Sequence, residues 1–125
     1  MGVTYKIDHE KHLVHAVGQG VVVLDDILAF FDAMVIQDAV GYPKLFDARE
    51  MLPRLSDDDF MVLAARVSAY AVFNPRGAIP AVATTHEAVL ALRRYANFLG
   101  DHDPPFRFFG SIDDARGWLM SLPVP

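Results

Sequence analysis

The chain has 125 residues, of which 53% are hydrophobic and 22% are charged, and its net charge is −5 with a pI near 5.3. This size and balance predict one globular domain, residues 1–125, and exclude the disordered and fibrous classes of protein. Without cysteine there are no disulfides, thiolate metal sites or thiol catalysis, and the acidic balance without a basic cluster argues against a nucleic-acid partner.

Membrane insertion is not expected from the sequence. No apolar run approaches the roughly 20 residues that a membrane-spanning helix needs. Residues 1–8 have neither the length nor the small-residue cleavage pattern of a signal peptide. We therefore expect a cytoplasmic protein without a membrane span.

The chain opens with a pattern that is typical of a β-hairpin. Apolar and polar residues alternate over residues 3–8, and a second extended run follows over residues 13–17. The triplet Gly18-Gln19-Gly20 is expected to break that second strand. Apolar residues at helical spacing then predict a first helix over about residues 24–38.

The centre of the predicted sheet is a buried strand over residues 43–49, which ends in the charged residues Asp47 and Arg49. Ser56 is a typical N-cap for the long helix that follows, and Asp57-Asp58-Asp59 places negative charge where the helix dipole favours it. One stripe of this helix is strongly apolar. A second, softer stripe predicts a further partner surface, and it consists of Met61, Ala65, Ser68 and Val72.

The second half of the chain continues the alternation of strand and helix. Residues 78–84 predict a buried strand, with one conflict, because Pro80 has no N–H to donate to a β-ladder. Thr84 and Glu87 fit a capping box that opens a helix through Leu99.

The last predicted elements complete the fold class. Residues 106–109 predict a strand, and Ser111 is the N-cap of a final helix in which Trp118 is expected to anchor the core. The resulting order is ββαβαβαβα. We predict an α/β fold with a mixed five-stranded sheet, whose N-terminal hairpin is antiparallel, whose other strands are largely parallel, and on which four helices pack.

Four short segments accompany this order of elements. They are Gly18-Gln19-Gly20, Leu45-Phe46-Asp47-Ala48-Arg49, Ala81-Val82-Ala83, and the stretch from Phe109 to Ala115-Arg116-Gly117-Trp118-Leu119. Together they resemble the STAS domain family over nearly the whole chain, in particular the small bacterial branch similar to sporulation anti-sigma-factor antagonists. The resemblance implies a βα sandwich that binds protein partners.

The resemblance also implies a switch at the start of the second helix, where the best-known members are phosphorylated on a serine. Ser56 is the position that matches best, although Leu55-Ser56-Asp57-Asp58-Asp59 stands here in place of an Asp-Ser-Ser-Gly run. A phosphate at Ser56 would gain from the helix N-terminus but would be repelled by the three carboxylates. Alternatively, the acidic turn already mimics the charged state.

Asp47 and Arg49 form a second candidate site. They alternate with Ala48 and so share a face of the sheet, at a predicted strand end of the kind where open α/β sheets tend to bind ligands. The competing interpretation is an ion pair that serves the fold.

Three histidines near the N-terminus suggest a metal site, but their spacing does not favour one. His9 lies in the predicted turn, and His12 and His15 are an odd number of residues apart, so they point to opposite faces. We expect no metal and no cofactor.

The aromatic residues at helical spacing are too many to be covered by one sheet. Phe30 and Phe73 are the candidates for an exposed apolar surface that meets a partner or a second copy in a homodimer.

Three functions remain open from the sequence. The leading one is a non-enzymatic STAS-like regulatory module that binds a protein partner through Ser56, Asp57 and Asp58, with Asp47 and Arg49 as further candidates. The alternative is a carrier or sensor of a small apolar ligand or lipid, because some STAS-like folds are similar to lipid-transfer domains. The third is a hydrolase built on Asp47, Arg49 and a histidine, although no segment resembles a nucleophile elbow.

Overall fold

The computed structural model describes residues 2–73, 77–99 and 106–122. Within these ranges the elements follow the predicted order ββαβαβαβα, which confirms the α/β class. The elements are β1 (Gly2–Asp8), β2 (Leu13–Val22), α1 (Leu24–Ile36), β3 (Lys44–Pro53), α2 (Asp57–Phe73), β4 (Ile79–Val82), α3 (His86–Leu99), β5 (Phe106–Phe109) and α4 (Ile112–Ser121).

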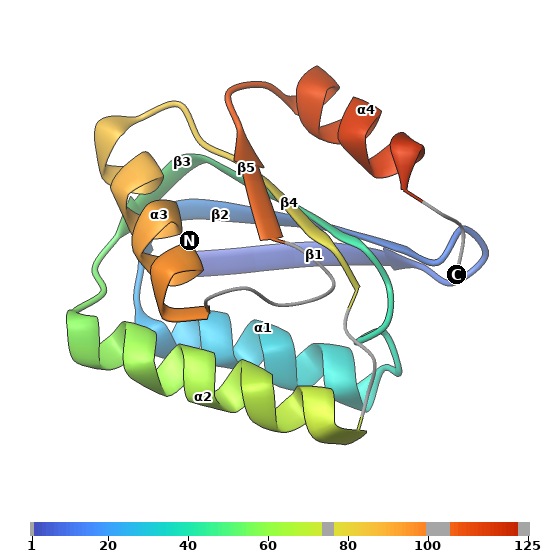
Figure 1. Cartoon of the computed structure of the whole chain (residues 1–125), viewed down its shortest axis with the longest axis horizontal. Helices are drawn as coiled ribbons and strands as arrows, with labels where there is room; N and C mark the ends of the chain where they lie inside the picture. Colours follow the sequence, from blue (N-terminus) through green and yellow to red (C-terminus); the bar gives the residue numbers. More distant parts are fainter. Residues whose placement is uncertain (1, 74–76, 100–105, 123–125) are drawn as a thin grey trace.

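The described strands form one mixed sheet in the order β1-β2-β3-β4-β5, in which β1 pairs with β2 antiparallel and the other neighbours pair parallel. The helices α1, α2 and α3 each connect two neighbouring parallel strands, and the strands follow one another across the sheet in chain order. Since such crossovers are right-handed, all three helices lie on the same face of the sheet. Figure 1 shows α1 and α2 side by side on one side of the sheet and α4 on the opposite side.

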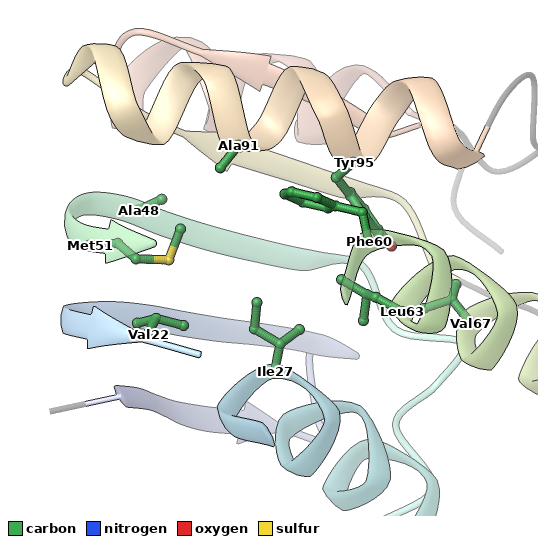
Figure 2. Close-up of a cluster of buried hydrophobic side chains, with 9 residues drawn as sticks. All are labelled: Val22, Ile27, Ala48, Met51, Phe60, Leu63, Val67, Ala91 and Tyr95. Atoms are coloured by element: carbon green, nitrogen blue, oxygen red, sulfur yellow. The ribbon is translucent and has the colours of Figure 1, made fainter. Parts of the chain in front are cut away.

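The largest buried cluster lies between the sheet and the helices α1, α2 and α3 (Figure 2). Its members are Val22, Ile27, Ala48, Met51, Phe60, Leu63, Val67, Ala91 and Tyr95. On the other face, α4 covers a smaller cluster of Leu45, Val82 and Ala115, and it packs over β3, β4 and β5. None of the described helices is long and apolar enough to cross a membrane.

The prediction that Gly18-Gln19-Gly20 ends the second strand is wrong, because β2 continues through these residues to Val22. The register with β3 shifts at this point, where Val17 pairs with Asp47 but Gln19 pairs with Glu50. A Cβ atom added at Gly18 would lie 2.8 Å from the Sδ atom of Met51. The glycine thus gives Met51 room to pack across an unbroken strand.

The central strand is longer than predicted. β3 runs over Lys44–Pro53 instead of residues 43–49, and the extra residue of the irregularity lies between Asp47 and Glu50. A β-bulge of this kind lets a strand continue past a break in its alternation. Asp47 and Arg49 therefore lie in the middle of β3 and not at its end, which corrects the predicted position of this site.

Helix ends follow the predicted caps with one exception. The N–H of Asp114 donates to Ser111 Oγ at 3.1 Å, which confirms Ser111 as the cap of α4. At α3, the N–H of Ala88 donates to Thr85 Oγ1 at 3.2 Å, so the cap is Thr85 and not Thr84. α1 ends at Ile36, two residues earlier than predicted.

Pro80 lies within β4, between β3 and β5, and interrupts the pairing with β3. The N–H of Lys44 donates to Ala78 O at 2.8 Å before the proline, and the pairs Phe46 with Ala81 and Asp47 with Val82 follow after it. On the other side Pro80 pairs with Arg107 of β5, so the strand continues although the proline has no N–H to donate.

Trp118 does not anchor the core as predicted. Its ring is half-buried and packs on Phe109, with 5.7 Å between ring centroids. The guanidinium group of Arg107 lies over both rings, 5.4 Å from the centroid of Phe109 and 5.6 Å from that of Trp118. The Trp118 side chain thus packs α4 against β5 at the edge of the domain.

Candidate functional site

The N-terminus of α2 is built around Ser56. The N–H of Asp59 donates to Ser56 Oγ at 3.1 Å, and the N–H of Ser56 donates to Asp59 Oδ2 at 2.9 Å. This reciprocal pair is a capping box, which confirms the predicted N-cap. Ser56 itself is exposed, so the residue that begins α2 is also accessible to a partner or a modifying enzyme.

The acidic first turn divides into two roles. Asp59 is half-buried and completes the capping box, whereas Asp57 and Asp58 are exposed. In the described part of the chain neither Asp57 nor Asp58 forms an ion pair. Their carboxylates are stabilised by the helix dipole and face solvent, so they display negative charge beside Ser56.

The second predicted stripe of α2 is exposed along the same helix. Met61 is 57% exposed and Val62 is 45% exposed, and Ala65 and Ser68 also face solvent. Met61 lies four residues after Asp57 and Val62 four residues after Asp58, so these pairs share faces of the helix. Apolar and acidic groups are therefore adjacent on this surface. The side chain of Val72 lies outside the described residues.

A shallow depression, which we call the outer hollow, separates the start of α2 from α3. It has a volume of about 190 Å³, and its walls include Pro53, Arg54, Leu55, Phe60, Glu87, Leu90, Ala91 and Arg94. The N–H of Arg54 donates to Val22 O at 2.9 Å, which holds the loop between β3 and α2 against the end of β2. At the rim, Arg54 and Glu87 form an ion pair of 3.5 Å, and both side chains are more than half exposed, so the pair adds little stability.

Beneath α2 and α3 lies an apolar space, which we call the inner cavity. Its volume is about 60 Å³, and its walls expose no polar atoms. Figure 2 shows Ile27, Leu63, Ala91 and Tyr95 reaching into this region from three helices. The remaining walls come from Phe31, Phe46, Met51, Leu55, Phe60, Ile79, Ala81, Leu92 and Phe106.

Asp47 and Arg49 form a bidentate ion pair on the sheet face opposite α1 and α2. Arg49 Nε donates to Asp47 Oδ1 at 2.9 Å, Arg49 Nη2 donates to Oδ2 at 2.8 Å, and the backbone N–H of Arg49 donates to Oδ1 at 3.1 Å. The hydrogen bonds from Arg49 hold the pKa of Asp47 below its usual value, although partial burial acts in the opposite direction. The shared face is confirmed, and the contact is the ion pair that the competing interpretation expected.

The groups around this ion pair do not form a nucleophile and base. Asp47 and Arg49 line a hollow together with Val17, Gln19 and Glu50, and Gln19 Nε2 donates to Glu50 Oε2 at 3.1 Å. Among the described residues no histidine lines this hollow, although His15 on β2 lies close enough to help lower the pKa of Asp47. The Nε2 atom of His15 has no hydrogen-bond partner in that part of the chain, so the geometry shows no hydrogen-bonded base for the hydrolase alternative.

The three histidines lie in different surroundings. His9 Nδ1 and the hydroxyl of Tyr42 are hydrogen-bonded at 2.8 Å, and His12 stacks on Tyr42 with 5.1 Å between ring centroids. Residue His15 lies on β2, and its Nε2 atom is buried without a hydrogen-bond partner among the described residues. In that part of the chain no three His, Asp or Glu side chains are grouped as metal ligands.

The prediction of an exposed surface at Phe30 is wrong. Phe30 is only 4% exposed, because α1 turns it toward the sheet, where it packs against Tyr5 and Phe46. Phe73 is the last residue of α2, and its side chain lies outside the described residues.

Sequence reasoning did not find the contribution of α3. Glu87, Leu90 and Arg94 line the outer hollow, and Ala91 reaches the inner cavity as well. The available signal was the small size of Ala91 at an inward position of this helix, since a small residue facing a large neighbouring helix leaves space.

Comparison with known proteins identifies the fold. The chain is similar to an uncharacterised protein of the DUF3478 family with a SpoIIAA-like fold from Shewanella loihica PV-4, with a TM-score of 0.60, 17% identity and coverage of 94% of each chain. No known family and no curated protein matches the sequence. At this identity the likeness concerns the fold alone, and the fold is SpoIIAA-like and therefore STAS-like.

Proposed function

We propose that this SpoIIAA-like chain is a non-enzymatic regulatory module of the cytoplasm that binds a protein partner, in the manner of anti-sigma-factor antagonists. The binding surface consists of Ser56, the acidic turn and the exposed stripe of α2. The observation that carries the proposal is the exposed Ser56 at the N-terminus of α2, in a fold of this type.

The chemistry of this surface supports a partner of defined character. Asp57 and Asp58 carry negative charge beside the exposed side chains of Met61 and Val62. An apolar centre bordered by charge is typical of protein interfaces, where the charges steer association and the apolar atoms supply affinity. We therefore expect a partner that presents an apolar patch with basic residues at its edge.

Affinity capture followed by titration tests the proposal. The bait proteins are the parent chain, Met61→Asp, and the control Met120→Asp, which places the same charge at the 85% exposed Met120 of α4. The proposal expects a protein recovered by the parent and the control but not by Met61→Asp, and roughly tenfold weaker binding of the purified partner to Met61→Asp. Equal affinity of the partner for all three chains would contradict the proposed surface.

A phosphoswitch at Ser56 is a separate part of the proposal. Ser56→Asp adds one more charge to a turn that already carries three carboxylates. If the acidic turn mimics the charged state, Ser56→Asp and Ser56→Asn should bind the partner equally. If phosphorylation is the switch, Ser56→Asp should differ from Ser56→Asn by roughly fivefold or more.

The inner cavity favours a second function, which is the binding of a small apolar ligand. The cavity is smaller than the roughly 150 Å³ apolar cavity that accommodates benzene, so only a small or flexible group would fit without movement of its walls. Native mass spectrometry of freshly purified protein should show a bound adduct. A mass equal to that of the chain alone, also after incubation with a small hydrocarbon, would argue against this function.

A further inference from the structure

The inner cavity and the outer hollow share part of their walls. Leu55, Phe60 and Ala91 line both spaces and therefore form the partition between them. Ala91 contributes only a methyl group, and Leu55 is a half-buried side chain of the loop that precedes α2. A rotation of Leu55 alone would thus bring the two spaces closer together.

The two spaces differ in their chemistry. The inner cavity exposes no polar atoms, so it offers water no hydrogen-bond partner and suits an alkyl group. The outer hollow has an apolar floor with charged groups at its rim. An occupant that fits both spaces is therefore an amphiphile with a single polar end.

The rim of the outer hollow selects the charge of that polar end. Arg54 and Arg94 provide two positive charges against the one negative charge of Glu87, on a chain whose net charge is −5. Arg54 is already paired with Glu87. Arg94 is exposed and forms no ion pair within the described residues, so its guanidinium group is available to an anion.

We propose that the chain binds a free medium-chain carboxylic acid. Its carboxylate lies beside Arg94, its alkyl chain runs along the outer hollow, and only the last two or three carbons pass Leu55 into the inner cavity. This inference rests on the second function proposed above and names its ligand class. Since the six carbons of benzene occupy a cavity of roughly 150 Å³, the volumes of about 60 and 190 Å³ together suit about ten non-hydrogen atoms, which is the size of octanoate.

Calorimetric titration of the full chain with octanoate, octanol and octylamine near pH 7 tests the inference, because octanoate is then ionised. Octanoate should bind roughly fivefold more tightly than octanol, and octylamine should bind more weakly than octanol. Arg94→Gln should abolish the preference for octanoate. The matched control is Arg93→Gln, which removes an exposed arginine one position earlier in α3 that does not line the hollow, and it should keep the preference.

Two further variants distinguish the contribution of the head group to binding from that of the alkyl chain. Glu87→Gln removes the negative charge at the rim and frees Arg54, so it should tighten octanoate binding without changing octanol binding. Ala91→Phe fills the partition and should abolish the binding of both, in a variant whose circular dichroism matches that of the parent.

The outcomes distinguish this inference from the function on which it rests. Equal affinities for octanoate and octanol, or equal effects of Arg93→Gln and Arg94→Gln, would overturn the carboxylate assignment and leave an apolar-ligand function standing. If none of the three compounds binds, the carboxylic-acid inference is overturned, and the mass measurement with a small hydrocarbon decides the apolar-ligand function separately.

Discussion

At the scale of single residues, Asp47 and Arg49 give the clearest link between geometry and a measurable property. The hydrogen bonds from Arg49 lower the pKa of Asp47 in the folded chain. The ionised carboxylate therefore stabilises the fold above the ordinary unfolded pKa of about 3.9, and this contribution is lost as the pH falls through the lower folded value. Arg49→Gln should raise the pKa of Asp47, because the hydrogen bonds of the guanidinium group to the carboxylate, which lower the pKa most, and its charge are removed while partial burial remains.

A carbon-13 NMR titration of the Asp47 carboxyl group measures this shift, with Arg54→Gln as the control that leaves the Asp47 contact intact. The difference in unfolding free energy between the parent and Arg49→Gln should be larger near pH 6 than near pH 2.5. An unchanged pKa of Asp47 in Arg49→Gln would show that the ion pair does not form in solution.

Lys44 is a buried cation that fastens the loop between α1 and β3. Its Nζ atom donates to Val40 O and to Tyr42 O, at 2.7 Å each, and the residue is only 3% exposed. Lys44→Met keeps the volume but removes the donor from both carbonyls, so it should lower the unfolding free energy by about 1–3 kcal/mol.

Chemical denaturation of Lys44→Met and of the control Lys6→Met, on the exposed side of β1, checks this prediction. The control should change stability by less than about 0.5 kcal/mol. If the two variants lose the same stability, the hydrogen bonds of Lys44 make no net contribution to the free energy of unfolding.

At the scale of elements, the start of α2 combines a structural and a functional role at Ser56. Ser56→Ala removes the acceptor of the Asp59 N–H and should lower the free energy of unfolding by about 1 kcal/mol. Ser56→Asn retains an acceptor, so its free energy of unfolding should lie within about 0.3 kcal/mol of that of the parent. Thermal and urea denaturation of the three chains measure the difference. Identical stabilities would mean that the cap does not support α2.

Substitution by alanine should change the stability in opposite directions at two glycines, Gly77 before β4 and Gly117 in α4. A Cβ atom at Gly77 would lie 2.0 Å from the backbone oxygen of Tyr42, so Gly77→Ala should cost at least about 2 kcal/mol. Gly117 lies in α4 with no atom within 4 Å of such a Cβ, so Gly117→Ala should stabilise the chain by up to about 1 kcal/mol. Changes of the same sign in urea denaturation would contradict these positions.

At the scale of the whole molecule, the sequence predicts what local patterns determine. Alternation and helical spacing give the element order, and the side chains of Ser56 and Ser111 mark two helix starts. The prediction failed where a distant residue decides the structure. β2 continues through Gly18 because this residue pairs with Val3 of β1 and the next residues pair with β3, and Met51 packs over the glycine. No local pattern near Gly18 contains that information.

The inner cavity has the same origin. It depends on how α2 and α3 meet, with Ala91 and Phe60 among the facing residues, and this relation is set by packing between elements far apart in the sequence. Sequence patterns therefore located the exposed surface of α2, which one helix provides, but not the space that needs three helices and a sheet.

Amide hydrogen exchange of the chain with and without its captured partner is the sharpest test of whether the first turns of α2 are the partner surface. The amides at a helix N-terminus have few intrahelical acceptors, so those of Asp57 and Asp58 should exchange rapidly in the free protein and contact there is readily detected. We expect slower exchange over residues 57–63 in the complex. Slower exchange confined to β1 and β2, with α2 unchanged, would contradict it.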